Sequence, residues 1–465
     1  EPILAAAEAA LRAPVPPILA SEILAFARTG AREPQERPHF ARRARLATLV
    51  LAACLDGTER YLDAAQDAVW AICEESSWLL SAHLGAYRSP EELPDPECFD
   101  VDLAVASTAL DLAEADSLLG ADLHPTVRRR LRLEVERRAT GPFLARDDFW
   151  WLRPRTAGGV VNNWTSVCVG GVVGAALYLE QDAARLASAV AKGAQALDHY
   201  LASFAPDGAS VEGPGYWAYG FAHYGHLSHL LEWRSGGRLS LLDGWLARRS
   251  ARFPLRVELS PGQYVPFSDA DQAQPMPAGL LAYLSQRLGD GDLRALIDRQ
   301  GEAPWEAPDC LADALRHLVW MHGLPAGDSW QPPVRDWIGG ADWLLARYCP
   351  ADPDGLVLAI KGGHNGESHN HNDLGQMVVH WRRESLVTDL GAGRYTREFF
   401  LAEHRYRHPA CASLGHAVPA VDGQGQQAGR DHAAQVLRRL GNDWEDGVDL
   451  ELSAAYPEAL GIRSL

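Results

Sequence analysis

The sequence predicts an α+β protein of two domains, a helical domain followed by a domain of antiparallel β-strands. Its 465 residues exceed what one ordinary hydrophobic core holds, so two domains are expected. Up to about residue 335 the apolar residues recur at helical three/four spacing, and beyond it the segments become short, β-branched and bounded by turns. Because helices followed by a run of strands indicate separate domains, we place them at residues 1–335 and 336–465.

The helical domain is predicted to consist of helices joined in pairs by short loops that contain proline and glycine. No strict period repeats along it, which argues against a repeat solenoid. We therefore expect helical hairpins that close into an α/α toroid, with an elongated helical array as the alternative. The predicted helices are residues 41–55, 59–74, 101–119, 125–138, 167–179, 182–204, 216–233 and 308–321.

The second domain is predicted to be an antiparallel sheet or a β-sandwich. It is short for two full sheets, so we expect the sandwich to be shortened or the chain to be truncated. The predicted strands are residues 343–348, 356–360, 376–381, 385–389, 417–422, 435–440 and 448–455.

Composition excludes several classes of partner. With 47% hydrophobic and 22% charged residues the chain is typical of soluble globular proteins, and no apolar run approaches the roughly 20 residues of a membrane helix. The formal net charge of −18 argues against nucleic-acid binding, although a cleft with its own local field can still hold an anionic substrate. The seven cysteines are scattered without a CxxC pair, which predicts free thiols.

The segment Ser368-His369-Asn370-His371-Asn372-Asp373 is the densest group of chemically active side chains. In an extended strand His369, His371 and Asp373 would share one face, because side chains alternate with period 2. A single buried histidine is most often a satisfied core residue. Here two histidines lie between glycines and precede an apolar strand. Burying so many polar groups requires partners or a metal, so a functional or metal site is predicted here.

A second polar group, Asn162-Asn163-Trp164, begins an apolar helix. A helix N-cap explains one asparagine, and the other can hold a carboxylate. Just before it, residues 148–155 supply aromatic faces and Arg153, which suit sugar rings and anionic substituents, although these tryptophans can equally be core. Farther upstream, Trp78 and His83 either line a cleft or cap a core.

The third group is a turn, then Glu212, then a Gly-Pro-Gly elbow, then Tyr216 at a helix start. Glycines allow a backbone to approach a ligand closely. A tyrosine at a helix N-terminus lies at the positive end of the dipole, which favours phenolate and suits a general acid or base. The alternative is a tyrosine that merely packs.

Together these motifs resemble the heparinase II/III-like polysaccharide lyases, a family that includes oligo-alginate lyases and broad glycosaminoglycan lyases. The resemblance covers roughly residues 70–425. It implies an incomplete α/α toroid followed by an antiparallel β-sandwich, and β-elimination at uronic acids of an anionic polysaccharide, heparin-like or alginate. The motifs that carry it are NNW (162–164), DGASVEGPGYWAYG (207–220) and HNHNDLG (369–375), with Asp389-Leu390-Gly391 after them.

The resemblance also implies roles for single residues. Asn162, with Asn163 as the near alternative, neutralises the substrate carboxylate. Tyr216 is the acid, and also the base when both reacting groups lie on one side, while His369 is a second base or co-neutraliser. We expect the active site in the cleft between toroid and sheet. The substrate-binding candidates are His83, Trp78, Arg153, Trp164, Glu212 and Tyr219.

A structural metal, commonly zinc, is often present in the sandwich of this family, and His371, Asp389 and His416 are the implied ligands. The family usually has His-Asn at the third position, whereas Ala417 follows His416 here. This departure leaves the third ligand open, with His404, His408 and His432 as competitors. Nitrogen and oxygen ligands suit zinc and also manganese.

Other functions are compatible with the same residues. A metal-dependent hydrolase would use His371, Asp389 and His416 around a catalytic water. A noncatalytic carbohydrate-binding protein needs neither Tyr216 nor His369, and a glycoside hydrolase needs paired carboxylates such as Glu212 and Asp207. The chain begins at Glu1 without a basic-then-apolar leader, so we expect a periplasmic or secreted bacterial protein whose leader is removed, or a cytoplasmic one.

Overall fold

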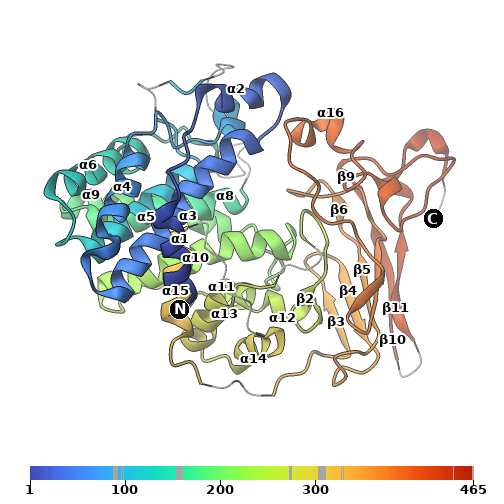
Figure 1. Cartoon of the computed structure of the whole chain (residues 1–465). Helices are drawn as coiled ribbons and strands as arrows, with labels where there is room; N and C mark the ends of the chain where they lie inside the picture. Colours follow the sequence, from blue (N-terminus) through green and yellow to red (C-terminus); the bar gives the residue numbers. More distant parts are fainter. Residues whose placement is uncertain are drawn as a thin grey trace. The chain divides into compact units, whose positions relative to one another are not determined.

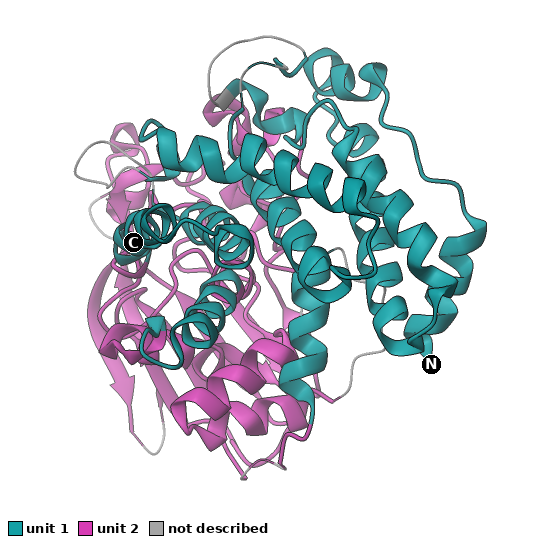
Figure 2. Cartoon of the chain, turned by 90° about the vertical axis from the view of Figure 1, so that its left-hand side faces the viewer, with its two compact units in different colours: residues 1–200, 223–241, 303–322 teal, residues 201–222, 242–302, 323–465 magenta. Residues whose placement is uncertain are grey.

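The computed structural model of the chain describes residues 1–86, 93–95, 97, 99–152, 161–271, 275–301, 310–325, 327, 329–442 and 445–462. The chain forms two compact units that alternate along the sequence (Figure 2). Unit 1 contains residues 1–200, 223–241 and 303–322, and unit 2 contains residues 201–222, 242–302 and 323–465. The change of texture near residue 335 therefore marks the start of the main sheet, which lies inside unit 2.

Unit 1 is built from helices, and each predicted helix is present (Figure 1). The longest, α3, continues through Pro38 in its first turns. Helix α10 begins in unit 2 and ends in unit 1. The helices are α1 (Pro2–Arg12), α2 (Ala20–Thr29), α3 (Glu33–Asp56), α4 (Leu62–Cys73), α5 (Leu103–Leu119), α6 (Pro125–Val135), α7 (Gly141–Ala145), α8 (Asn163–Leu179), α9 (Ala183–Leu201), α10 (Pro214–Ser235) and α15 (Leu311–Met321).

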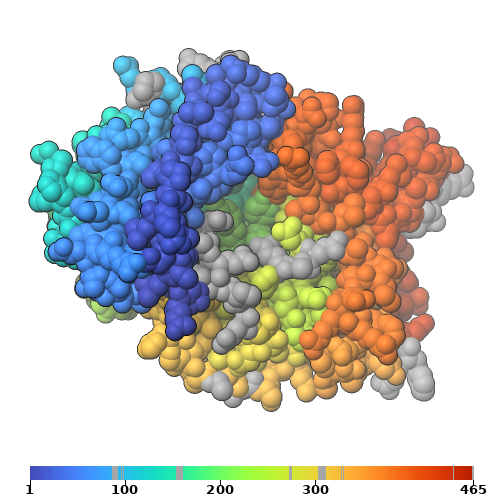
Figure 3. Space-filling view, in the orientation of Figure 1, coloured from blue at the N-terminus to red at the C-terminus, as the bar shows by residue number. Residues whose placement is uncertain are grey.

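Helices α5 and α8 form the centre of unit 1, because residues on nearly all sides of both helices are buried. Small residues let their backbones approach closely. A Cβ at Gly171 would lie 2.4 Å from the carbonyl oxygen of Ala106 in α5, so only glycine fits there. At the surface of the same unit, α1 (dark blue in Figure 3) turns Ile3 and Ala7 inward. Among the helices that the structure describes, none has the length and apolar character to cross a membrane.

Unit 2 combines short helices with antiparallel strands (Figure 1). Its main sheet has five strands in the order β3-β4-β5-β7-β8. The strands are β3 (Arg335–Ile338), β4 (Trp343–Arg347), β5 (Val357–Lys361), β7 (Met377–Trp381) and β8 (Glu384–Val387). Two-stranded pairs are β1 (Glu258–Ser260) with β2 (Gln263–Tyr264), β6 (His364–Asn365) with β9 (Gly429–Ala433), and β10 (Gln435–Gly441) with β11 (Asp446–Glu451). The helices wholly within this unit are α11 (Trp245–Ala251), α12 (Phe253–Val257), α13 (Ala278–Leu288), α14 (Gly291–Gln300) and α16 (Ala402–Arg405).

The register of the main sheet defines its buried face. Trp343 pairs with Lys361, and Ala359 pairs with both Leu345 and Val378, so these side chains share one buried face. The antiparallel prediction is confirmed, whereas the toroid and the full sandwich stay predictions. The strand predicted at residues 417–422 is wrong: only an isolated bridge, Val421 with Gln424, forms there, because the segment turns back at Gly423.

Candidate active site

The elbow before α10 places Tyr216 in the first turn of that helix. Gly213 has φ +89°, and a Cβ on it would lie 2.5 Å from the carbonyl oxygen of Phe267, so glycine is required. Pro214 then occupies the first helical position, which suits its fixed φ and missing N–H. The sequence therefore fixes the direction in which the Tyr216 side chain leaves the backbone.

Within unit 2, Tyr216 lies against His369. Their rings stack with centroids 3.7 Å apart and planes inclined by 16°. Nδ1 of His369 lies 3.1 Å from Oε2 of Glu212, and the Tyr216 hydroxyl lies 2.6 Å from the hydroxyl of Tyr395. An aromatic acid or base, an imidazole and a carboxylate thus occupy one cluster.

Burial makes Tyr216 a phenol and not the phenolate that its helix position suggested. Desolvation raises the pKa of Tyr216 far above its ordinary value, and the hydrogen bond with Tyr395 only partly opposes this. The pKa of Tyr395 is raised as well, by burial first and then by the neighbouring Tyr216 and Asp269. At neutral pH both groups hold their protons, which suits a general acid.

The prediction that His369, His371 and Asp373 share one face of a strand is wrong. The segment consists of turns, and His369 has φ +59°, in the left-handed region. The three side chains consequently reach different partners. His369 contacts Glu212, His371 Nε2 lies 2.9 Å from Oδ1 of Asp269, and Asp373 accepts two hydrogen bonds from the buried Lys361 ammonium at 2.7 and 2.8 Å.

Three residues of this cluster were missed by sequence reasoning: Asp269, Tyr395 and Arg405. Asp269 joins His371 to Arg405, whose Nη2 lies 3.1 Å from its other carboxylate oxygen. Burial opposes ionisation of Asp269, but the bond from His371 and the charge of Arg405 hold its pKa below the ordinary value. Tyr395 follows the DLG motif closely, a weak signal, whereas nothing in the sequence around Asp269 distinguishes it from a loop aspartate.

The predicted metal ligands His371, Asp389 and His416 lie together in unit 2, with Asp373 beside them. One ligand atom from each of the four falls within 4.8 Å of the others. His371 Nδ1 lies 3.9 Å from Oδ1 of Asp389, and His416 Nδ1 lies 3.1 Å from Oδ2. Among the competing histidines, His408 and His432 direct Nδ1 to backbone groups instead.

The chemistry of this cluster fits a divalent cation. The buried Nδ1 atoms of His371 and His416 make no hydrogen bond of good geometry, yet both face Asp389. Burial opposes the charge on Asp389, but His416 and His371 hold its pKa below the ordinary value, and Asp389 in turn raises the pKa of His416 against the effect of burial. The side chains of all three are fully buried, which suits a structural ion and leaves no open position for a substrate.

The predicted site residues of unit 1 form a separate cluster around the start of α8. Asn162 is the N-cap, and its Oδ1 accepts a hydrogen bond from the Trp164 amide at 3.0 Å. This leaves its Nδ2 group without a hydrogen-bond partner among the residues that the structure describes. Asn163 is buried in the first turn.

Trp164 packs edge-on against His83 at 4.6 Å between centroids, and Nδ1 of His83 lies 2.7 Å from Oδ2 of Asp102. Trp78 is only 1% exposed and donates to the Ile72 carbonyl, so it is a core residue and we propose no substrate contact for it. Tyr219 is 39% exposed on α10. Arg153 lies outside the described residues.

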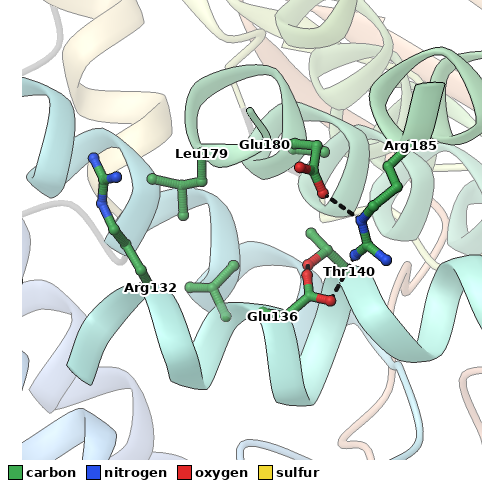
Figure 4. A pocket seen from close by; sticks show the side chains of 8 residues that line it. Arg132, Glu136, Thr140, Leu179, Glu180 and Arg185 are labelled. Atoms are coloured by element: carbon green, nitrogen blue, oxygen red, sulfur yellow. Dashed lines mark hydrogen bonds and ion pairs between the residues drawn. The ribbon is translucent and has the colours of Figure 1, made fainter. Parts of the chain in front are cut away.

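A separate cavity of about 290 Å³ lies among helices of unit 1 (Figure 4). At its polar end Arg185 pairs with Glu180 and Glu136 at 2.8 and 2.6 Å, and Thr140 donates to Glu136. Its charges are therefore balanced locally, and its lining contains none of the predicted site residues. The lining residues are Arg132, Val135, Glu136, Thr140, Ala176, Leu179, Glu180 and Arg185.

Comparison with known proteins finds similarity in structure. No family model and no curated protein sequence matches the chain. The structure is similar to crystal structures of heparinase III (TM-score 0.58, 14% identity) and of a heparan sulfate lyase variant from Pedobacter heparinus (TM-score 0.58, 13% identity). A heparinase III gene product gives a TM-score of 0.57 at 12% identity.

These similarities extend over nearly the whole chain, covering 92%, 96% and 97% of it in the same order. The chain spans only 60%, 66% and 70% of the length of those structures. The protein thus has the fold of heparinase III and heparan sulfate lyase, and the resemblance predicted from the three motifs is confirmed at the level of the fold.

Proposed function

We propose that the protein is a polysaccharide lyase that cleaves uronic-acid-containing polysaccharides by β-elimination. The observation that carries the proposal is the stack of Tyr216 on His369, with Glu212 and Tyr395 bonded to the two rings. The fold shared with heparinase III supports the same conclusion. The substrate is an anionic polysaccharide of the heparin-like glycosaminoglycan or alginate type.

In this reaction the C5 proton of the uronate is removed and the C4–O4 bond breaks, so that a C4=C5 double bond forms. Asn162 donates its amide to the uronate carboxylate and stabilises the charge that develops there, with Asn163 as the alternative. His369 accepts the C5 proton. Tyr216, which burial keeps protonated, gives its proton to the leaving O4.

We propose that His371, Asp389 and His416 hold one divalent ion, zinc or manganese, with Asp373 beside it. When bound, the ion supplies positive charge that ties the loop of His371 to the segments of Asp389 and His416. Because His371 is two residues from His369, this crosslink would steady the loop that carries the proposed base.

The other enzyme classes are less well supported. A metal-dependent hydrolase needs an open coordination position, whereas these ligands are fully buried. A glycoside hydrolase needs two available carboxylates, but Glu212 is bonded to His369 and Asp207 is paired with Arg256 at 3.1 Å. A noncatalytic binding protein has no use for the Tyr216–His369 pair.

The proposal is tested by incubating the protein with a panel of uronate polysaccharides, including heparan sulfate, chondroitin sulfate, hyaluronan and alginate. The expected result is a rise in ultraviolet absorbance from the unsaturated uronate with at least one polymer. Binding without any such product, measured at enzyme concentrations high enough to detect a single turnover, would leave a noncatalytic carbohydrate-binding protein as the better account.

A further inference from the structure

Three features within unit 2 fix the imidazole of His369: its backbone conformation, a stacked ring and a hydrogen bond. Its backbone is in the left-handed region, with φ +59°, which residues with a side chain seldom adopt. One ring face lies on Tyr216, at 3.7 Å between centroids. Nδ1 faces a carboxylate oxygen of Glu212 at 3.1 Å, and Nε2 has no hydrogen-bond partner in the described part of the chain. Nε2 is thus the ring nitrogen left available for chemistry.

Glu212 lies on a segment of backbone whose conformation is constrained. It directly precedes Gly213, where the Phe267 carbonyl lies so near that no side chain fits, and Pro214 starts α10 immediately afterwards. The side chains of Glu212 and His369 are each only 12% exposed. Because the elbow fixes both Glu212 and Tyr216, one short segment sets the position of the imidazole edge and of its face.

We propose that Glu212 is a positioning residue that fixes the tautomer of His369, and not a contact to the substrate. Its carboxylate accepts a hydrogen bond from Nδ1–H, which places the lone pair of the neutral imidazole on Nε2. This inference rests on the proposed function, since it assigns to His369 the removal of a proton.

The proposal accounts for each proton in that step. The C5–H bond breaks, Nε2 accepts the proton, and Nδ1 keeps its own proton on the hydrogen bond to Glu212. The imidazolium that results lies beside a carboxylate, which stabilises its charge. The opposite tautomer would carry a proton on Nε2 and leave no lone pair for the substrate.

Charge also argues against a direct substrate contact. A carboxylate turned toward a polyanionic chain repels it, and this cost is largest where water is excluded. Its hydrogen bond turns the Glu212 carboxylate toward the imidazole edge, and the negative charge is balanced once His369 takes up the C5 proton.

Steady-state kinetics separate the two roles. Glu212→Gln keeps the size of the side chain but lets its amide donate to Nδ1, which favours the wrong tautomer. We expect kcat to fall by about 10²-fold or more, within the range that a general base contributes, with KM nearly unchanged. A raised KM with unchanged kcat would show a substrate contact and overturn the proposal, and so would unchanged kinetics.

Glu258→Gln is the matched control, because Glu258 is a buried carboxylate of unit 2 that pairs with Arg299 at 3.0 Å. It should leave kcat unchanged. Glu212→Asp keeps the acceptor and should recover part of the activity lost in Glu212→Gln. Thermal unfolding of each variant verifies that the fold is intact.

Nitrogen NMR on histidine-labelled protein tests the proposal without any substrate. The signal of His369 among the 17 histidines is assigned by its loss in His369→Gln. At a pH where ordinary imidazoles are neutral, we expect the Nδ1–H tautomer in the native protein and a shift toward Nε2–H in Glu212→Gln. An Nε2–H tautomer in the native protein would overturn the proposal. If the polysaccharide panel gives no product but this spectrum is as expected, the proposed function fails and the positioning role of Glu212 stands.

Discussion

The polar cluster of unit 1 and that of unit 2 are held in place by different means. Around Asn162 the polar groups serve the helices: Asn162 caps α8, and Asp102, the partner of His83, caps α5 through the Val105 amide at 2.8 Å. Around His369 the side chains hold one another, on a backbone turn that costs roughly 1–2 kcal/mol for a residue other than glycine. The hydrogen bonds of the first cluster cap helices, whereas those of the second cap no helix.

This difference suggests how substitutions should separate activity from stability. In unit 1 a substitution that removes the cap changes stability even where it also changes activity. In the cluster around His369 the substituted groups contribute mainly to the reaction. The predictions below run from the largest expected effect to the smallest.

Tyr216→Phe should cause the largest loss. It removes the proposed acid but keeps the ring that stacks on His369, so kcat should fall by about 10²–10⁴-fold while substrate binding persists. Stability should change by only about 1 kcal/mol, for one lost hydrogen bond to Tyr395. Tyr224→Phe is the control, because Tyr224 is a buried tyrosine farther along α10 whose hydroxyl donates to the Leu241 carbonyl at 2.7 Å. Full lyase activity in Tyr216→Phe would refute the mechanism.

Asn162 offers a way to separate its two roles. Asn162→Ala should lower the rate by about 10²–10³-fold, for a lost donor to the developing charge, and should also cost about 1 kcal/mol for the lost cap. Asn162→Asp keeps the cap acceptor and removes the donor, so it should lose activity at nearly unchanged stability. If only Asn163→Ala affects the rate, the neutraliser is the neighbouring residue. If neither matters, the lyase proposal itself is contradicted.

Loss of the metal or of one of its ligands should lower the stability of the protein more than the rate of the reaction. Elemental analysis of protein purified without chelator should give about one equivalent of a divalent ion, and Asp389→Asn should abolish it and lower Tm. His432→Ala is the control, because its Nδ1 bonds to the Ala454 carbonyl, away from the cluster. Metal-free protein whose Tm does not respond to added zinc or manganese would rule the site out.

The smallest expected effect is a pH dependence of stability in unit 1. Burial holds the pKa of His226 well below 6.5, aided by Arg316, His223 and His229, although Asp313 lies 3.4 Å away. The unfolded chain therefore binds more protons below pH 6.5 than the folded one, and stability is lost as the pH falls below that value. Each pKa unit between the folded and unfolded values corresponds to about 1.4 kcal/mol of unfolding free energy.

Denaturant unfolding at neutral and mildly acidic pH measures how the free energy of unfolding changes with pH. The slope of this dependence should be smaller in His226→Gln. The comparison with the variant is needed because burial raises the pKa of Asp111, which acts in the opposite direction at lower pH. An equal slope in His226→Gln would show that other groups set the acid sensitivity.

Local patterns predicted the helices, most strands and the fold family, because apolar periodicity and turn residues are local properties. The interleaving of the two units was not predictable in this way, since nothing local marks residues 201–222 as part of unit 2. The positions of Trp78 and Trp164 were equally ambiguous. A tryptophan fits a core or a cleft, and only packing decides between them.

The sequence predicted which residues form the candidate site better than it predicted how they are arranged. His371, Asp389 and His416 were chosen by resemblance, and the fold brings them together. The strand assumed for His369 and His371 was wrong because alternation presupposes an extended backbone, whereas His369 is left-handed. Asp269 and Tyr395 joined the site through tertiary contacts that have no signature in the sequence.

The most direct test of the central claim is the fate of solvent oxygen during cleavage. The enzyme is incubated in water enriched in heavy oxygen with a uronate polysaccharide that it cleaves, and the products are analysed by mass spectrometry. β-Elimination predicts new non-reducing ends that lack the mass of one water and absorb in the ultraviolet. The new reducing ends should carry no heavy oxygen in samples reduced with borohydride at once, before they exchange oxygen with water, and all these products should be lost in Tyr216→Phe. Saturated non-reducing ends of full mass, together with heavy oxygen at the reducing ends from the earliest sample, would show hydrolysis and contradict the account.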